Sequence, residues 1–431
     1  SFCCIICSRE MIFGVRAIAM FYETLIDKIL YQIKKLIPTS VFNFFAPAYH
    51  ALLAYAGALW YGFPSRSMKV IGVTGTKGKS STVYLITKIL EETGHAVAAI
   101  GSLGYKIKEK EWPNTLKMTM PGRFRLQKFL AEARKAGCEY VVLEVTSEGI
   151  AQGRIKGIAF DCAVVTNLHR EHLESHGSFE NYRNAKGELF QRTKNIHVLN
   201  SDDEQGEYFA NFYAKKKIFY GVNRGDMRAS DIQLRPDGST FVVYGTRFDL
   251  HLTGKFNILN ALAAMSTAAM YGVDLPTVQP ILARIEELPG RMQFIQRKPF
   301  AVVVDYAHTP DSLKTVYETL KQDSNKLVCV LGAAGGGRDK WKRPEFGAIA
   351  DQWCDEVILT DEDPFEENPR QIVSQIEAGI KNRAKITVIM DRREAIVVAI
   401  KKAEQNDTVI ITGKGSETSM AVADGKKIPW S

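Results

Sequence analysis

The stretch VIGVTGTKGKSS, residues 70–81, places a short apolar run directly before a glycine-rich loop. Residues 68–73 read MKVIGV, which has the length and composition of a buried strand. From Ser80 to Thr93 apolar residues recur at helical spacing, and Gly94 marks the end of that helix. A strand, a glycine-rich loop and a helix in this order predict an α/β fold whose first loop can hold an anion.

The loop has the residue types that phosphate groups require. Gly75 and Gly78 let backbone N–H groups approach a ligand closely, Lys79 supplies a positive charge, and Ser80 is a candidate Mg²⁺ ligand. Val73 stands where the strict Walker pattern has its first glycine. The loop therefore departs from the exact consensus but keeps the residue types that bind phosphate. We interpret the loop as a nucleotide site and not as a turn without a ligand.

Strand and helix patterns continue after this loop. The apolar runs YVVLEV (140–145) and CAVVTNL (162–168) each follow a helical stretch, which predicts a parallel sheet with crossover helices. Short alternating strands follow at 229–252. Residues 287–292, ELPGRM, mark a break, and a second series of strands and helices begins near residue 300. The sequence therefore predicts two α/β units.

Size and charge narrow the class of partner. A chain of 431 residues is too long for one ordinary core, which predicts two or three domains. The 56 Lys and Arg residues exceed the 48 Asp and Glu residues, and the formal charge of +8 is spread along the chain. This favours small anionic substrates over nucleic acid. Cys138, Cys162, Cys329 and Cys354 lie in or beside apolar runs, so we expect buried thiols in a reducing cytoplasm.

Residues 1–66 are expected to form an atypical helical segment. No secretory signal is predicted, because charged residues interrupt the first apolar stretch. Residues 22–37 repeat apolar positions at helical spacing, and residues 46–63 are apolar almost throughout. For 46–63 we favour a helix packed on its neighbour over a membrane span, with attachment to a membrane surface as the minority interpretation.

Side chains that can bind a cation gather between Glu144 and Lys186. Glu144 ends a strand in LEVTSEG, where its carboxylate can reach a cation beside bound phosphates. His172 lies in TNLHREHLESHG, and from spacing alone a functional and a merely solvated histidine are equal alternatives. Lys186 taken alone is typical of a solvated helix lysine.

Several motifs, in this order, resemble those of the Mur ligases, above all the MurE type. They are GVTGTKGKSST, LEVTSEGIAQGR, TNLHREHLESHGSFENYRNAK, GKFNILNALAA, LPGRM, VDYAHTPDSL, GRDKWKRPEFG and GKGSE. The resemblance implies an enzyme that uses ATP to phosphorylate a carboxylate, after which an amine displaces the phosphate to form an amide. It also implies a P-loop central domain over 67–288 and a Rossmann-like C-terminal domain over 289–431, preceded by the short helical segment 1–66.

The resemblance assigns residues to ATP, to two Mg²⁺ ions and to catalysis. Lys186 matches the carbamylated lysine of the family, which makes chemical sense because a carbamate, unlike an ammonium, can bind metal. The expected ATP-binding residues are Gly75, Thr76, Lys77, Gly78, Lys79, Ser80, Ser81, Asn257, Asn260, Arg291, Asp305 and His308. The expected metal ligands are Ser80, Glu144, His172 and carbamylated Lys186, and the expected catalytic residues are Lys79, Glu144, His172, Lys186 and Arg291.

The acceptor side departs from the family pattern. The positions that match residues holding the muramoyl peptide are Thr119, Ser147, Gln152 and Arg154. Met118 and Met120 flank Thr119 where a paired threonine is common, and Glu148 replaces the usual histidine. Residues 1–66 stand in place of the usual uridine-binding domain, which leaves open whether the acceptor is linked to a nucleotide.

The amino-acid side also departs from it. The positions that match residues binding the incoming amino acid are Arg338, Asp363, Gly413 and Glu417. In TDEDPFEENP (360–369), Phe365 occupies the place of the arginine that diaminopimelate enzymes use, so a second carboxylate would be poorly paired. The acidic residues of this loop suit a basic amino acid such as L-lysine, although an ordinary solvated loop is an equal alternative.

The sequence thus predicts a ligase that adds an amino acid, first of all lysine, to UDP-N-acetylmuramoyl-L-Ala-D-Glu through an acyl phosphate, in peptidoglycan precursor synthesis. We expect a cytoplasmic monomer whose partners are ATP, the UDP-muramoyl peptide and the amino acid. One alternative is a Mur-like ligase that acts on another carboxylate, such as a folate or an amino-acid polymer. Another is a nucleotide-binding protein without catalysis.

Overall fold

The structure is a computed structural model that describes residues 39–114, 118–171 and 173–430. Helix α2 (Thr39–Trp60) packs against α4 (Arg123–Lys135), so the apolar run at 46–63 lies mainly in a helix that packs on a neighbouring helix. Within the described ranges no helix, α2 included, combines the length and apolarity needed to cross a bilayer. The prediction for residues 22–37 lies outside the described residues.

The central lobe is built on a nine-stranded sheet, with strand order β4-β3-β2-β5-β1-β6-β7-β8-β9. All neighbouring strands from β2 to β9 pair in parallel, whereas β3 and β4 form an antiparallel edge. The strands are β1 (Lys69–Thr74), β2 (Val97–Gly101), β3 (Gly104–Ile107), β4 (Lys110–Trp112), β5 (Tyr140–Glu144), β6 (Phe160–Val165), β7 (Ile196–Asn200), β8 (Lys216–Gly221) and β9 (Met227–Arg228).

Helices cover both faces of this sheet. Alternate residues of the central strands point to opposite faces: Ile71 and Val73 join one core, and Val70 joins the other. The first core includes α3 (Lys79–Glu92) and α9 (Lys255–Met270), and the second includes α4 and α7 (Phe179–Arg192). The shorter elements of this lobe are η1 (Pro64–Ser67), α5 (Ser147–Ala151), α6 (Leu173–His176), α8 (Gly206–Ala210) and α10 (Leu275–Ala283).

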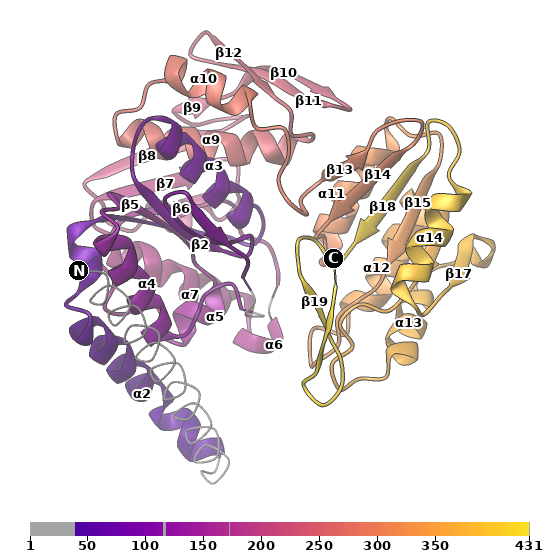
Figure 1. Cartoon of the computed structure of the whole chain (residues 1–431), viewed down its shortest axis with the longest axis horizontal. Helices are drawn as coiled ribbons and strands as arrows, with labels where there is room; N and C mark the ends of the chain where they lie inside the picture. The colour runs from indigo at the N-terminus through magenta and orange to yellow at the C-terminus, as the bar shows by residue number, and fades with distance from the viewer. Residues whose placement is uncertain (1–38, 115–117, 172, 431) are drawn as a thin grey trace, which may run out of the picture.

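The alternating strands predicted at 229–252 form a small antiparallel sheet of β10 (Ser230–Arg235), β11 (Gly238–Val243) and β12 (Thr246–Leu250). This sheet lies at one end of the central lobe, where α10 packs against β12 (Figure 1). The Pro-Gly break at 287–292 lies between α10 and the first strand of the next sheet. The boundaries 67–288 and 289–431 stay a prediction.

The C-terminal lobe has a six-stranded sheet of order β13-β14-β18-β15-β16-β17, parallel except for β13. One face packs on α11 (Pro310–Lys321), α12 (Lys342–Trp353) and α13 (Pro369–Glu377), and the other on α14 (Arg392–Lys402). The remaining elements are β13 (Gln293–Gln296), β14 (Ala301–Asp305), β15 (Leu327–Leu331), β16 (Glu356–Leu359), β17 (Ile386–Val388), β18 (Thr408–Thr412), β19 (Ser419–Ala421), β20 (Lys427–Pro429) and η2 (Arg383–Lys385).

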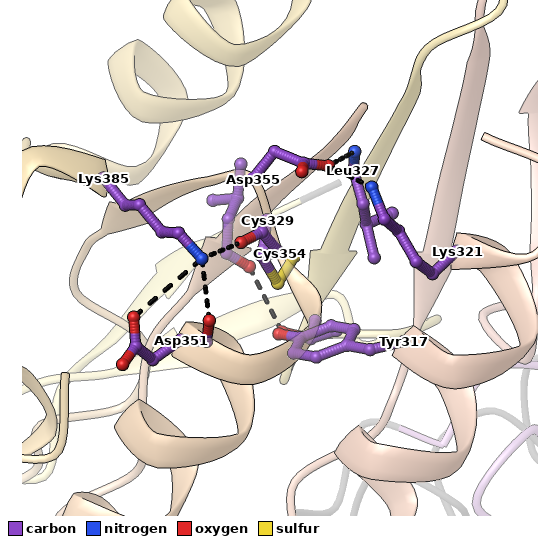
Figure 2. Close-up of a disulfide and its surroundings, with 10 residues drawn as sticks. Tyr317, Lys321, Leu327, Cys329, Asp351, Cys354, Asp355 and Lys385 are labelled. Carbon is purple, nitrogen blue, oxygen red and sulfur yellow. Dashed lines mark hydrogen bonds and ion pairs between the residues drawn. A yellow bond between two sulfur atoms is a disulfide. The ribbon is translucent and has the colours of Figure 1, made fainter. Parts of the chain in front are cut away.

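The cysteine prediction needs one correction. Cys138 and Cys162 are free and buried, as expected, but Cys329 and Cys354 form a disulfide (Figure 2). Cys329 lies on β15, and Cys354 ends α12 immediately before β16, the strand that pairs with β15. Pairing of these strands brings the two Cα atoms to 6.1 Å, although they are 25 residues apart in the sequence. A local apolar pattern does not contain that information.

Candidate active site

The glycine-rich loop joins β1 to α3 in the way that the sequence predicts. Gly75 has a φ of +144° and Gly78 a φ of +77°, values that side-chain-bearing residues rarely adopt. A Cβ atom at Gly75 would clash with Thr166, and one at Gly78 would clash with Asn260. Both glycines are therefore required for the backbone to pass this close to the neighbouring elements.

Lys79, at the first position of α3, lies over this loop. Its Nζ donates to the carbonyl oxygens of Gly75 at 3.0 Å and Thr76 at 2.9 Å. Lys77 lies between the lobes: its Nζ contacts Thr309 Oγ1 and is 3.5 Å from Glu171 Oε2. Burial lowers the pKa of Lys77 to about 8, partly offset by the Glu171 carboxylate.

The end of β5 brings a carboxylate to the loop. Glu144 is 2% exposed, and its Oε1 accepts from Ser80 Oγ at 3.1 Å while its Oε2 accepts from the Ser102 backbone N–H at 2.7 Å. A hydroxyl beside a carboxylate is a donor pair that suits Mg²⁺, which takes oxygen ligands and keeps several waters. The predicted metal ligands Ser80 and Glu144 are thus in contact, whereas His172 lies outside the described residues. Across 39–114, 118–171 and 173–430 no group of three His, Cys, Asp or Glu side chains is close enough to hold a metal ion.

Lys186 is a buried lysine, not a solvated one. It lies on α7 with 1% of its surface exposed, and its Nζ donates to Gly75 O at 2.8 Å. Burial, and then the positive charge of Lys79, holds the pKa of Lys186 well below its usual range. The fold therefore favours its neutral amine and places that amine beside the loop.

Three predicted residues reach the site from the hinge and the C-terminal lobe. Arg291 stacks on the ring of Tyr306 at 4.4 Å. Asp305 accepts from the backbone N–H groups of Met292 at 2.7 Å and Ala307 at 2.6 Å, so it holds the turn that carries Arg291 and His308. His308 Nδ1 donates to Tyr306 O at 2.7 Å, and burial, followed by the charge of Lys77, lowers the pKa of His308 to about 3. His308 is thus a neutral imidazole.

Sequence reasoning missed the acidic residue between the lobes. Glu171 is 3% exposed, and besides Lys77 it faces two groups of the C-terminal lobe: Lys342 Nζ at 3.6 Å and His308 Nε2 at 4.0 Å. Lys342 also pairs with Asp339 at 3.0 Å. Glu171 and Lys342 occur in two quoted motifs, but their meeting depends on how the lobes close, which no local pattern contains.

The two lobes enclose a cavity of about 810 Å³. Every predicted ATP-binding residue except Gly75 lines it, and Asn257 and Asn260 are held there because Asn260 Nδ2 donates to Asn257 Oδ1 at 3.2 Å. At another part of the wall Arg154 Nη2 donates to Gln152 Oε1 at 2.7 Å, and Thr119 bonds Ser102 at 3.0 Å. All four predicted acceptor residues line the cavity: Thr119, Ser147, Gln152 and Arg154.

The predicted amino-acid residues divide into two groups. Arg338 lines the cavity and lies 5.8 Å from the ring of Phe365. Asp363 and Glu417 are not among the lining residues; both pair with the buried Lys414 Nζ, at 3.0 and 3.1 Å. Gly413 lies behind the wall as well, where a Cβ would clash with Glu362.

Comparisons with known proteins agree with this geometry. Residues 73–268 match the Mur ligase middle domain, and residues 290–415 match the Mur ligase glutamate ligase domain. The chain is 37% identical over 389 residues to a UDP-N-acetylmuramoyl-L-alanyl-D-glutamate–2,6-diaminopimelate ligase of Geobacillus thermodenitrificans, covering 87% of this chain and 78% of the relative. A UDP-N-acetylmuramyl-tripeptide synthetase of Roseiflexus is 36% identical, covering 89% and 81%.

The chain is a Mur ligase.

Solved structures agree on the architecture. A UDP-N-acetylmuramoyl-L-alanyl-D-glutamate–2,6-diaminopimelate ligase superposes with a TM-score of 0.59 at 34% identity, covering 84% of this chain and 76% of that one. A folylpolyglutamate synthase of Mycobacterium tuberculosis superposes with a TM-score of 0.68 at 19% identity, covering 84% and 92%, which shows a shared fold alone. Mur ligases are ATP-dependent amide ligases that use Mg²⁺, so the predictions of family, fold and enzyme class are confirmed.

For a Mur ligase, the two faces of this cavity carry complementary parts. The central lobe supplies the glycine-rich loop, where Ser80 and Glu144 are the pair that would hold Mg²⁺. Bound there, the ion would neutralise phosphate oxygens. The C-terminal lobe supplies neutral His308 and the cations Arg338 and Lys342. Positive groups that converge on an enclosed site favour a reaction in which negative charge builds up on transferring oxygens.

Proposed function

We propose that this Mur ligase joins an amino acid to the peptide carboxylate of a UDP-N-acetylmuramoyl dipeptide. The observation that carries the proposal is that one cavity is lined by the phosphate loop, by the acceptor residues around Arg154 and by Arg338 of the opposite lobe. The relatives that are 36–37% identical are named as ligases or synthetases for this class of acceptor.

In this reaction the acceptor carboxylate attacks the γ-phosphorus of ATP, forming an acyl phosphate and releasing ADP. The amine nitrogen then attacks the acyl carbon, the C–O bond to phosphate breaks, and the amine loses a proton. The positive charges of Lys79 and Arg291 would stabilise the negative charge on the phosphate oxygens. Closure of the lobes excludes the water that would hydrolyse the acyl phosphate.

Lys186 would act as a carbamate. Its neutral amine attacks CO₂, an N–C bond forms, and one proton is released, which turns a potential cation into an anion. Support comes from its burial, from its lowered pKa and from its contact with Gly75 O at 2.8 Å. A carbamate there would add oxygen atoms to the ligand pair Ser80 and Glu144.

The amino acid is proposed to carry a second amino group. Of the acidic loop residues 361–367, Glu362 lines the cavity, and burial raises its pKa to about 7. Glu367 is paired with Arg343 at 3.0 Å and Asp363 with Lys414, so two of the loop's five acidic side chains are compensated inside the protein. A distal ammonium near Glu362 would favour its ionised form.

Lysine and diaminopimelate both have that ammonium. We place lysine first, because Phe365 offers no guanidinium to the additional carboxylate of diaminopimelate. Diaminopimelate is the second candidate, because several relatives are named for it.

The deciding experiment supplies ATP and UDP-muramoyl-L-Ala-D-Glu with lysine, diaminopimelate, ornithine or alanine, and measures ADP release and the mass of the new peptide. We expect turnover with lysine at the highest kcat/KM, and a rise in KM for lysine of about tenfold in Glu362→Gln but not in the exposed Glu366→Gln. Preference for diaminopimelate would refute the choice of amino acid. ADP release only with a folate or another carboxylate acceptor would refute the proposed acceptor, and no turnover with any acceptor would favour a protein that only binds nucleotide.

A further inference from the structure

Helix α2 is apolar on two opposite faces, and one of them packs on the central lobe. Its 22 residues include no Asp, Glu, Lys or Arg. The packed face consists of small residues: Ala54, Gly57 and Ala58 are buried, and a Cβ atom at Gly57 would lie 3.5 Å from Phe124 and Gln127 of α4. Small side chains let the two helices approach closely, so this face holds α2 along α4.

The opposite face of α2, which we call the outer face, carries large apolar side chains that are exposed. Leu52 is 69% exposed, Tyr55 47%, Leu59 70% and Trp60 79%. Positions 52, 55 and 59 are three and four residues apart, so their side chains lie on one side of the helix. An exposed apolar surface of this kind marks a site of interaction more often than an ordinary surface. Figure 1 shows α2 on the side of the central lobe that faces away from the C-terminal lobe, so closure of the lobes would leave the outer face uncovered.

Positive charge lies beside the outer face. Residues 39–69 contain two basic residues and no acidic one, and α4 contains five Lys and Arg residues against one Glu. Arg134 of α4 donates to the backbone oxygens of Tyr61 and Gly62 at 3.1 Å each, so its guanidinium lies at the end of α2 that carries Trp60. Exposed Leu and Trp side chains with cations beside them are typical of protein surfaces that meet the headgroups of a lipid bilayer.

We propose that the outer face of α2 binds to the surface of a membrane that contains anionic lipids. The helix would lie along the membrane, because its other face is held on α4. Its apolar side chains would enter the boundary between headgroups and acyl chains, and the cations of α4 would attract lipid phosphates. A second copy would bring two positively charged α4 helices together, and residues 22–37 carry three lysines against two acidic residues, so neither supplies the negative charge that lipids do. Binding at this face does not require the proposed ligase reaction.

The test is flotation of the whole chain with phosphatidylcholine vesicles that contain or lack phosphatidylglycerol. We expect binding to the anionic vesicles, and weaker binding at high salt. The double variant Leu59→Ser, Trp60→Ser should bind about tenfold more weakly, because it removes apolar surface that would leave water. Leu234→Ser, Tyr213→Ser is the matched control: these side chains are 49% and 66% exposed elsewhere on the central lobe, and their loss should leave binding unchanged. Lys135→Gln, at an exposed position of α4, should weaken binding to the anionic vesicles about fivefold.

Trp60 also gives a readout at the site itself. Acyl chains labelled with bromine should quench the tryptophan fluorescence of the wild-type protein on anionic vesicles. Trp60→Phe keeps an aromatic side chain, so it should retain vesicle binding and lose most of this quenching. Quenching that is unchanged in Trp60→Phe would overturn the proposed contact.

The absence of vesicle binding would also overturn the proposal, and two further measurements identify the occupant in that case. Self-association in sedimentation that is lost in the Leu59→Ser, Trp60→Ser variant would assign the outer face to a second copy. A lower free energy of unfolding in that variant, without self-association, would assign it to another segment of this chain. ADP release in buffer without vesicles should be the same in all variants, and its absence in the wild-type protein would refute the proposed function while leaving membrane binding to the flotation result.

Discussion

Replacing Glu171 by glutamine removes a negative charge that faces cations of both lobes. The carboxylate lies 3.5 Å from Lys77 and 3.6 Å from Lys342. At an effective dielectric constant of about 20, each such pair has a gross attraction of about 5 kcal/mol, most of which desolvation offsets. Lys342 keeps its bond to Asp339 in the variant. We therefore expect the contact between the lobes to lose about 2 kcal/mol. This lowers the equilibrium constant for lobe closure by a factor of about 30.

The assay is phosphate release as a function of ATP concentration, at saturating acceptor and amino acid. Glu171→Gln should raise the KM for ATP on the order of 30-fold. Without the carboxylate the closed state is less populated, so more ATP is needed to reach it. Glu180→Gln is the matched control, since Glu180 is exposed and pairs with Arg183 at 3.7 Å within one helix. A wild-type KM and kcat in Glu171→Gln would refute the role of this contact between the lobes.

Three further predictions follow from single features. Lys186→Ala should lose activity and regain part of it with added short carboxylates; full activity without rescue would contradict the carbamate. Because the pKa of Lys77 is lowered to about 8, kcat/KM for ATP should fall as pH rises through 8 and the cation loses its proton, and Lys77→Gln should lack this limb of the profile. Reducing the Cys329–Cys354 disulfide should lower the free energy of unfolding by about 3 kcal/mol, measured by denaturation with and without reductant, and Cys329→Ser should make the protein insensitive to reductant.

The sequence was most informative where structure is local. The strand before Gly75, the helix from Lys79 and the second α/β series follow from apolar periodicity and glycine positions within short windows, and the structure confirms them. Glu144 was found in the same way, because the end of a strand predicts where its side chain lies relative to a neighbouring loop.

Contacts between distant segments could not be predicted from such windows. Glu171 links the two lobes because it lies close to Lys342 of the other lobe. The disulfide likewise depends on the pairing of β15 with β16. The acidic loop at 361–367 illustrates the same limit: its composition suggests a cationic ligand, but Lys414 and Arg343 pair with two of its five acidic side chains inside the protein. Which acidic side chains remain available to a ligand depends on the internal ion pairs that form when the chain folds.

The central claim is that the acceptor carboxylate takes the phosphoryl group of ATP before the amine attacks. It is tested most directly with an acceptor whose reacting carboxylate is labelled with ¹⁸O. We expect the inorganic phosphate released in each turnover to carry one ¹⁸O atom from the acceptor, as mass spectrometry of the phosphate would show. Phosphate without label, at full formation of the peptide bond, would contradict it.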